Sequence, residues 1–115
     1  MADTPRVSWA HLKSREPSDA DRAARRAELV QRGRAVREHG WEGSAEGWTA
    51  RERAIVAYLL EDEAVLEGLE ESEGEVLTRL AGELYGFQGA RKEIGSGLVK
   101  TQEWVAGTRG QIGRG

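Results

Sequence analysis

The stretch that decides the fold is TARERAIVAYLLEDEAVLEGL, residues 49–69. It begins with Thr49, and Glu52 follows three residues later, which is the spacing of a capping box at a helix N-terminus. Large apolar residues then recur at helical spacing on one face, namely Ile55, Tyr58, Leu59, Val65, Leu66 and Leu69. The pattern predicts a helix over residues 50–69.

Asp62 falls in the middle of this apolar face. Either an arginine pairs with its carboxylate, or the helix breaks near residues 61–63. We favour an arginine, from another helix or another subunit, because an unpaired buried carboxylate would take up a proton.

Helix signals also precede this stretch. Ser18 follows a proline and comes before two aspartates in what would be the first turn, which is typical of a helix N-cap. Gly40 supplies a stop signal. The pattern predicts a helix over residues 19–38.

Downstream, positions over residues 77–105 alternate by three and four, which is heptad spacing. These positions are Leu77, Leu80, Leu84, Phe87, Arg91, Ile94, Leu98, Thr101 and Val105. Glycines interrupt them, and each interior glycine costs about 0.8–1 kcal/mol relative to alanine. We therefore expect breaks near residues 86–89 and 95–97, and two helices over about 75–87 and 90–105. With the helices predicted upstream, the fold class is all-α, with three to four helices.

The two ends of the chain lack these signals. Residues 1–16 are predicted to form an extended arm, and residues 107–115 a flexible basic tail rich in glycine and arginine. A helical domain over residues 17–106 remains between them. A core this small can be completed by self-association.

Charge is sorted along the chain. Residues 1–40 carry 9 Lys/Arg and 6 Asp/Glu (net +3), residues 41–75 carry 2 and 11 (net −9), and residues 76–115 carry 6 and 3 (net +3). Opposite blocks attract each other, within one molecule or between copies. The sequence therefore predicts that the acidic block over residues 61–75 docks on the arginine-bearing surface of residues 22–37, within or between subunits.

The residues assigned to this docking fall into two sets. The charged set comprises Arg22, Arg25, Arg26, Arg32, Arg34, Asp62, Glu63, Glu67 and Glu70. The interface set joins rigid tryptophan anchors to the heptad seam, and it comprises Trp9, Trp41, Trp48, Trp104, Leu77, Leu80, Leu84, Phe87, Ile94 and Leu98.

The chain offers little for catalysis. It has no cysteine, which excludes disulfides, thiolate metal sites and thiol chemistry. His11 and His39 have no second ligand or nucleophile at a useful spacing. The acidic residues 61–63 are adjacent, and neighbours on a helix fan out by about 100°, so they do not converge on one ion. We predict a protein that is not an enzyme, with no catalytic residue, cofactor or metal.

Location is constrained by what the sequence lacks. No secretory leader is readable at the N-terminus, and the longest apolar run, residues 54–60, is too short to span a bilayer. We expect a cytoplasmic protein, or a virion subunit assembled in the cytoplasm, with no membrane contact and no small-molecule substrate.

One short motif resembles a known family. Trp41-Glu42-Gly43 lies between two predicted helices, and it is similar to the Trp-x-Gly turn of small secreted helical-hairpin proteins. Tyr58 and Asp62 have the spacing of that family's Tyr-x-x-x-Asp secretion signal. In this chain they fall inside the second predicted helix, whereas the family's signal lies beyond it.

An alternative function is DNA binding. Residues 80–98 resemble the first helix, turn and recognition helix of a helix-turn-helix unit, although Gly86 follows Ala81 by five residues instead of four. The basic residues assigned to phosphate contacts are Arg91, Lys92, Arg109 and Arg114. This hypothesis predicts an antitoxin-like regulator.

The sequence favours a small non-enzymatic assembly or interaction subunit, encoded by a phage or mobile element. Its partner is predicted to be another protein or a further copy of the chain in a homo-oligomer. Nucleic acid is the partner under the alternative hypothesis.

Overall fold

The computed structural model describes residues 16–113, and every regular element in this part of the chain is an α-helix. The helices are α2 (Asp19–Ser44), α3 (Ala50–Leu59), α4 (Glu63–Gly68), α5 (Glu73–Gly95) and α6 (Val99–Gly113). The predicted all-α class is confirmed. The predicted arm before Glu16, with Trp9, and the predicted contact residue Arg114 lie outside the described residues.

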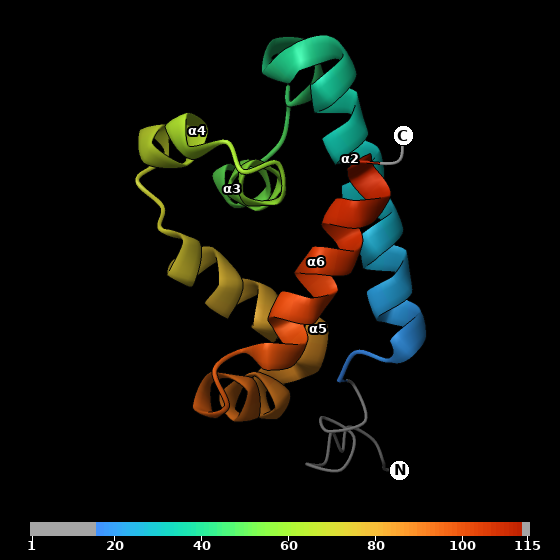
Figure 1. The fold of residues 1–115 in the computed structure, drawn as a ribbon, viewed down its shortest axis with the longest axis vertical. Coiled ribbons are helices and arrows are strands. Elements are labelled where there is room, and N and C mark those ends of the chain that lie inside the picture. Colours follow the sequence, from blue (N-terminus) through green and yellow to red (C-terminus); the bar gives the residue numbers. More distant parts are fainter. Residues whose placement is uncertain (1–15, 114–115) are drawn as a thin grey trace, which may run out of the picture.

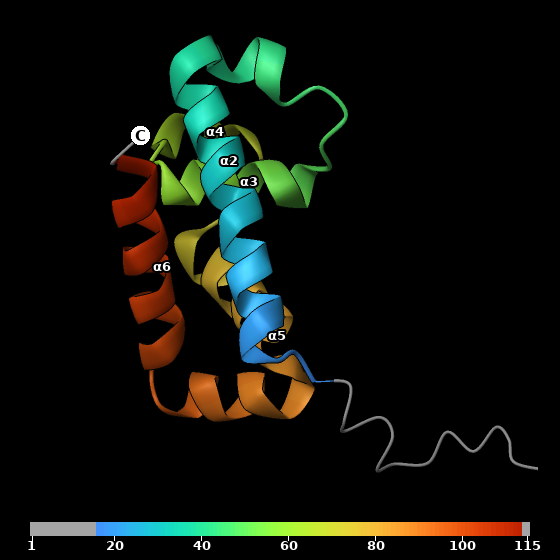
Figure 2. The ribbon, with the colours of Figure 1, turned by 90° about the vertical axis from the view of Figure 1, so that its right-hand side faces the viewer.

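The helices form an elongated body of 53 × 32 × 28 Å. α2 and α6 run side by side along its length (Figure 1). α3 crosses the centre and contacts α2, α5 and α6, while α4 packs on α3. The second half of α5 turns across the end of the body that lies away from α4 and from the C-terminal end of α2 (Figure 2).

The core is centred on α3. Its residues 54–59 are all buried, because this helix is surrounded by its neighbours on every side. Leu29 of α2, Leu80 and Leu84 of α5 and Val105 of α6 close the core around it, each with at most 1% of its surface exposed. Burying a side chain of this size contributes about 1.5–3 kcal/mol to stability. The few large buried residues around α3 therefore supply much of the stability of the fold.

Three helices begin with the capping boxes that the sequence contains. The side-chain oxygens of Ser18, Thr49 and Ser72 each accept a hydrogen bond at 3.1 Å from the backbone N–H three residues later. The acidic side chain at that third position accepts the N–H of the cap in return. The predicted N-caps of α2 and α3 are confirmed.

The predicted helix over residues 50–69 is two helices, so the alternative of a break near residues 61–63 is confirmed, and no arginine of residues 16–113 is the favoured partner of Asp62. The chain breaks after α3, and Asp62 becomes the N-cap of α4, where it accepts the N–H of Val65 at 3.3 Å. Its other oxygen accepts the Nε1–H of Trp41 at 2.9 Å. Two uncharged donors therefore satisfy the carboxylate that the sequence assigns to an ion pair.

Glycines place the other breaks, near the expected positions. α2 extends beyond the predicted residue 38, but it kinks at Gly40, whose φ is +84°. α5 is interrupted at Gly86, with φ +78°, and it ends at a turn that includes Gly97, with φ +87°. Only a residue without Cβ adopts such a φ without strain. The bounds of α5 and α6 differ from the predicted 75–87 and 90–105 accordingly.

The predicted seam over residues 77–105 is not one continuous face. Leu80 and Leu84 are buried and Leu77 is half-buried, but Phe87 is 76% exposed and Ile94 is 51% exposed. The turn at Gly86 changes the direction of the helix, so residues after it do not continue the face that precedes it. The heptad pattern therefore predicts buried residues correctly up to Leu84 and within α6, but not in the segment between them.

The predicted flexible tail is wrong for residues 107–113, which form the last turns of α6. Ile112 is buried against α2. Arg34 donates a hydrogen bond to the carbonyl of Gln111 at 2.6 Å, and Arg37 to that of Ile112 at 3.1 Å. Composition alone misses this order, because the partners that satisfy the free carbonyls of the helix end come from α2.

We predict that Gly33→Ala destabilises the fold. A Cβ at Gly33 would lie 2.7 Å from Cδ1 of buried Ile112. Overpacking of this kind costs about 1–3 kcal/mol, which exceeds the gain of about 0.8–1 kcal/mol in helix propensity. Chemical denaturation should show a loss of about 1 kcal/mol.

The same substitution in an Ile112→Val background, which lacks Cδ1, should be neutral or stabilising. Gly110→Ala is the matched control, because a Cβ there meets no atom within 4 Å, and it should not destabilise the protein. An equal loss of stability from Gly33→Ala in both backgrounds would contradict the proposed close approach of α2 and α6.

Candidate functional site

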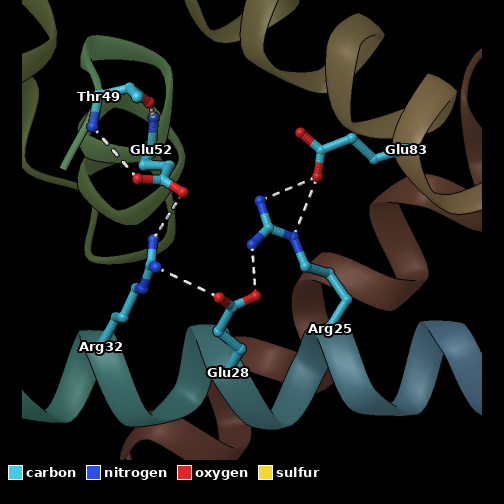
Figure 3. A network of polar contacts seen from close by, with 6 residues as sticks. All are labelled: Arg25, Glu28, Arg32, Thr49, Glu52 and Glu83. Carbon is cyan, nitrogen blue, oxygen red and sulfur yellow. Dashed lines mark hydrogen bonds and ion pairs between the residues drawn. The ribbon is translucent and has the colours of Figure 1, made fainter.

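The arginines of α2 form ion pairs with glutamates other than those predicted (Figure 3). Arg25 pairs with Glu28 at 2.7 Å and with Glu83 of α5 at 2.9 Å. Arg32 pairs with the same Glu28 and with Glu52 of α3, each at 3.2 Å. This network ties α2 to α3 and α5.

The network is reflected in two pKa values. Partial burial would lower the pKa of Arg25, but its hydrogen bond to Glu28 and the charges of Glu83 and Glu28 raise it. The backbone N–H of Thr49 lowers the pKa of Glu52, and the hydrogen bond and charge of Arg32 lower it further. Both pKa shifts favour the charged forms of Arg25 and Glu52, which agrees with their places in the network.

Other arginines bind backbone carbonyls. Arg22 donates to the carbonyl of Leu84 at 2.8 Å, where Gly86 interrupts α5, and Arg26 donates to that of Trp104 at 3.1 Å. Their guanidinium groups also lie over aromatic rings, at 5.1 Å from the centre of Tyr85 and 5.0 Å from that of Trp104. These arginines are therefore occupied with holding α5 and α6 against α2.

Two of the predicted tryptophan anchors also have partners inside the molecule. Trp104 is 8% exposed beneath Arg26. Trp48 lies under Arg32, with 4.9 Å between the guanidinium carbon and the ring centre. Neither is placed as a protruding anchor.

The acidic block over residues 61–75 forms no ion pair with an arginine of the described α2. Glu63, Glu67 and Glu70 are exposed, and within residues 16–113 no ion pair joins them to an arginine of α2. Glu71 alone among the glutamates of this block pairs with an arginine of the described chain, Arg79. Docking of the acidic block on the first helix within one molecule is therefore a wrong prediction.

An apolar hollow of about 410 Å³ lies beside these acids. Trp41, Ala45, Val65, Gly68 and Leu69 form its apolar walls, and Glu42 and Glu46 are exposed at its edge. Half-buried Arg53 of α3 also lines it and donates a hydrogen bond to the carbonyl of Ala45 at 3.1 Å. We call these eight residues the acidic groove. It joins the C-terminal end of α2 to α4.

The groove is rigidly built around Trp41. The Trp41 ring meets Trp48 edge-on, with 6.4 Å between the ring centres and 79° between the planes. Its Nε1–H is held by Asp62 at 2.9 Å. A half-buried tryptophan fixed on two sides keeps an apolar surface open to a partner at low entropic cost.

A second exposed apolar surface lies at the opposite end of the body, on the second half of α5 and the start of α6. Phe87, Ile94 and Val99 are 76%, 51% and 52% exposed. Arg91 lies between the first two on the same helix face, 5.9 Å from the centre of the Phe87 ring. Lys92 is exposed on the flank. We call these five residues the basic face.

The one acid in the segment that carries the basic face is buried. Residues 86–100 contain Arg91, Lys92 and Lys100 and a single acid, Glu93. Glu93 is 6% exposed, and its carboxylate accepts hydrogen bonds from the backbone N–H and the hydroxyl of Thr101 at 2.8 and 2.9 Å. The exposed charge of this segment is therefore wholly positive.

The residues assigned to a helix-turn-helix do not form one. Ile94, predicted as a core position of the recognition helix, is 51% exposed, and Leu98 lies in the turn between α5 and α6. Arg109 donates to the carbonyls of Tyr58 and Leu59 at 2.6 and 3.1 Å, so it caps α3. Arg91 and Lys92 are exposed as predicted.

Two other kinds of site are absent from residues 16–113. No cluster of three acidic or histidine side chains there is arranged to hold a metal ion. No helix in the same residues combines the length and apolar character needed to cross a membrane.

We predict that Glu52→Gln lowers stability at neutral pH by about 0.5–1 kcal/mol. Glutamine retains the capping box but loses the charge that faces Arg32. Because the folded pKa of Glu52 lies below its ordinary value of 4.5, its contribution is present above that pH and is lost as the pH falls through the folded pKa. The measurement is the free energy of unfolding from pH 7 down to pH 3.

The difference between wild type and Glu52→Gln should be constant near neutrality and shrink below about pH 4.5. Glu103→Gln is the matched control, because Glu103 is exposed on α6 and makes no ion pair with another described residue. A pH dependence that is the same for both variants would contradict a stabilising charge at Glu52.

Comparison of the chain with protein-family models, with curated proteins and with solved structures found no match, so the two surfaces stand on their own geometry.

Proposed function

We propose that this protein is a small non-enzymatic interaction subunit, and that its acidic groove binds a basic amphipathic segment of a protein. The observation that carries the proposal is the combination of an apolar hollow, with Trp41 in its wall, and exposed carboxylates on its edge. A ligand that fits must present apolar side chains to the hollow and positive charge to Glu42 and Glu46.

The apolar part supplies most of the affinity. Burying apolar surface contributes about 25 cal/mol per Å², and aromatic side chains in preformed hollows are frequent centres of binding energy. Trp41 is already fixed by Asp62 and Trp48, so a ligand does not have to order it. The fixed ring is a reason to place the contact here and not at Trp48 or Trp104, which arginines cover.

The acidic residues determine which ligands the groove accepts. Glu42 is exposed on α2, Glu63 and Glu67 are exposed on α4, and Glu46 and Glu70 are exposed just beyond the C-caps of these two helices. Exposed charges increase association rates and reject partners of like charge more than they add affinity. A basic ligand is therefore favoured over an acidic or neutral one.

Two of the acids occupy backbone conformations that favour glycine. Glu61 and Glu70, which follow the ends of α3 and α4, both have φ +58°. A left-handed conformation costs a non-glycine residue roughly 1–2 kcal/mol. Carboxylates at these positions, in a chain with 15 glycines, support a role for negative charge on this surface.

We predict that the protein binds a fluorescent Leu/Lys amphipathic helical peptide, and that a Leu/Glu peptide of the same pattern does not bind. Anisotropy titration should show binding that weakens as salt is added, because the rim charges are exposed. Glu42→Lys with Glu46→Lys should weaken binding by about tenfold or more, a change of about 1.4 kcal/mol or more.

The matched control is Glu38→Lys with Glu103→Lys, which changes the net charge equally at exposed positions outside the groove. This control should retain most of the affinity. An equal loss of peptide affinity in both double variants would mean that binding depends on net charge alone. It would contradict the groove as the binding site. Duplex DNA at low salt is the competing ligand, and binding of DNA without binding of peptide would favour the regulator instead.

A further inference from the structure

We infer that the partner of the acidic groove is the basic face of a second copy of this chain. The inference rests on the proposed function and names its ligand. The basic face has the two properties that the groove requires, since Phe87 and Ile94 present apolar side chains and Arg91 lies between them with positive charge. Both surfaces are described on the same chain.

The arrangement of the basic face fits an extended hollow. Phe87, Arg91 and Ile94 are four and three residues apart, so they project from one side of the second half of α5. This is the spacing with which an amphipathic helix places its anchors in an apolar groove. Phe87 is the single phenylalanine of the chain, and its ring is 76% exposed.

Charge complementarity selects this pairing over the others. The groove carries Glu42 and Glu46 with Glu63, Glu67 and Glu70 nearby, and the face carries Arg91 and Lys92, with Lys100 next to Val99. Contact between two grooves would oppose glutamates, and contact between two faces would oppose cations. Like charges brought together at an interface cost several kcal/mol.

The groove and the basic face of one molecule cannot contact each other. The groove lies where the end of α2 meets α4, and the basic face lies on the second half of α5 at the other end of the body (Figure 1). The contact must therefore form between copies, with the groove of one against the face of the next. Such head-to-tail contacts form rings when the rotation closes and filaments when it does not.

The test is sedimentation velocity of the full chain over a range of concentrations. The wild type should exceed the monomer mass of 12.7 kDa, increasingly so at high concentration. A groove variant, Glu42→Lys with Glu46→Lys, and a face variant, Phe87→Ser with Ile94→Ser, should each be monomeric. Both substitutions of the face variant are at exposed positions, and thermal melts monitored by circular dichroism verify that each variant is folded.

The decisive sample is an equimolar mixture of the two variants. The groove variant keeps an intact face and the face variant an intact groove, so the mixture should form a species of twice the chain mass and nothing larger. Glu38→Lys with Glu103→Lys should associate as the wild type does.

Failure of this inference differs from failure of the proposed function. A wild type that is monomeric at every concentration but binds the Leu/Lys peptide would overturn self-docking and leave the groove as a site for another protein. Association that persists in the face variant, or a mixture that stays monomeric, would also overturn the pairing. Absence of both self-association and peptide binding would overturn the two proposals together.

Discussion

Hydrogen bonds from arginine to backbone carbonyls are the interaction on which the structure depends. Arginines of α2, α3 and α6 donate to backbone carbonyls of other helices, in most cases near an end or a break of the helix that accepts, and they comprise Arg22, Arg26, Arg34, Arg37, Arg53 and Arg109. A hydrogen bond to a charged group contributes about 1.5–3 kcal/mol. With a core centred on one ten-residue helix, these contacts are what hold α5 and α6 in place.

This use of arginine explains the charge distribution on the surface. The guanidinium groups of α2 are neutralised by Glu28, Glu52 and Glu83 or directed at carbonyls, so they offer little positive charge to a partner. The acids of α4 receive no compensation from them. A chain that is nearly balanced in sequence therefore folds with one strongly acidic region, while within residues 16–113 the exposed cations Arg91 and Lys92 lie at the far end of α5 and Arg51 lies at the start of α3.

Local chemistry made much of the fold predictable. Capping boxes at Thr49 and Ser72 mark helix starts because the side chains that form them are three residues apart, and glycines mark the breaks because of their φ values. The end of α6 was not predictable, since its carbonyls are satisfied by arginines about 75 residues away. The same holds for Asp62, whose donor is Trp41 of another helix.

The candidate surfaces were predictable only in part. The acidic block and Trp41 stand out in the sequence, but the hollow that joins them requires α4 to break from α3 at Asp62. Likewise Phe87 and Ile94 belong to a heptad pattern that reads as a core face, and the turn at Gly86 exposes them. The residues that break the pattern thus create both surfaces. A two-fold symmetric contact through either surface alone would oppose like charges, so their separation at opposite ends of one rigid body favours a repeating head-to-tail contact over a symmetric pair.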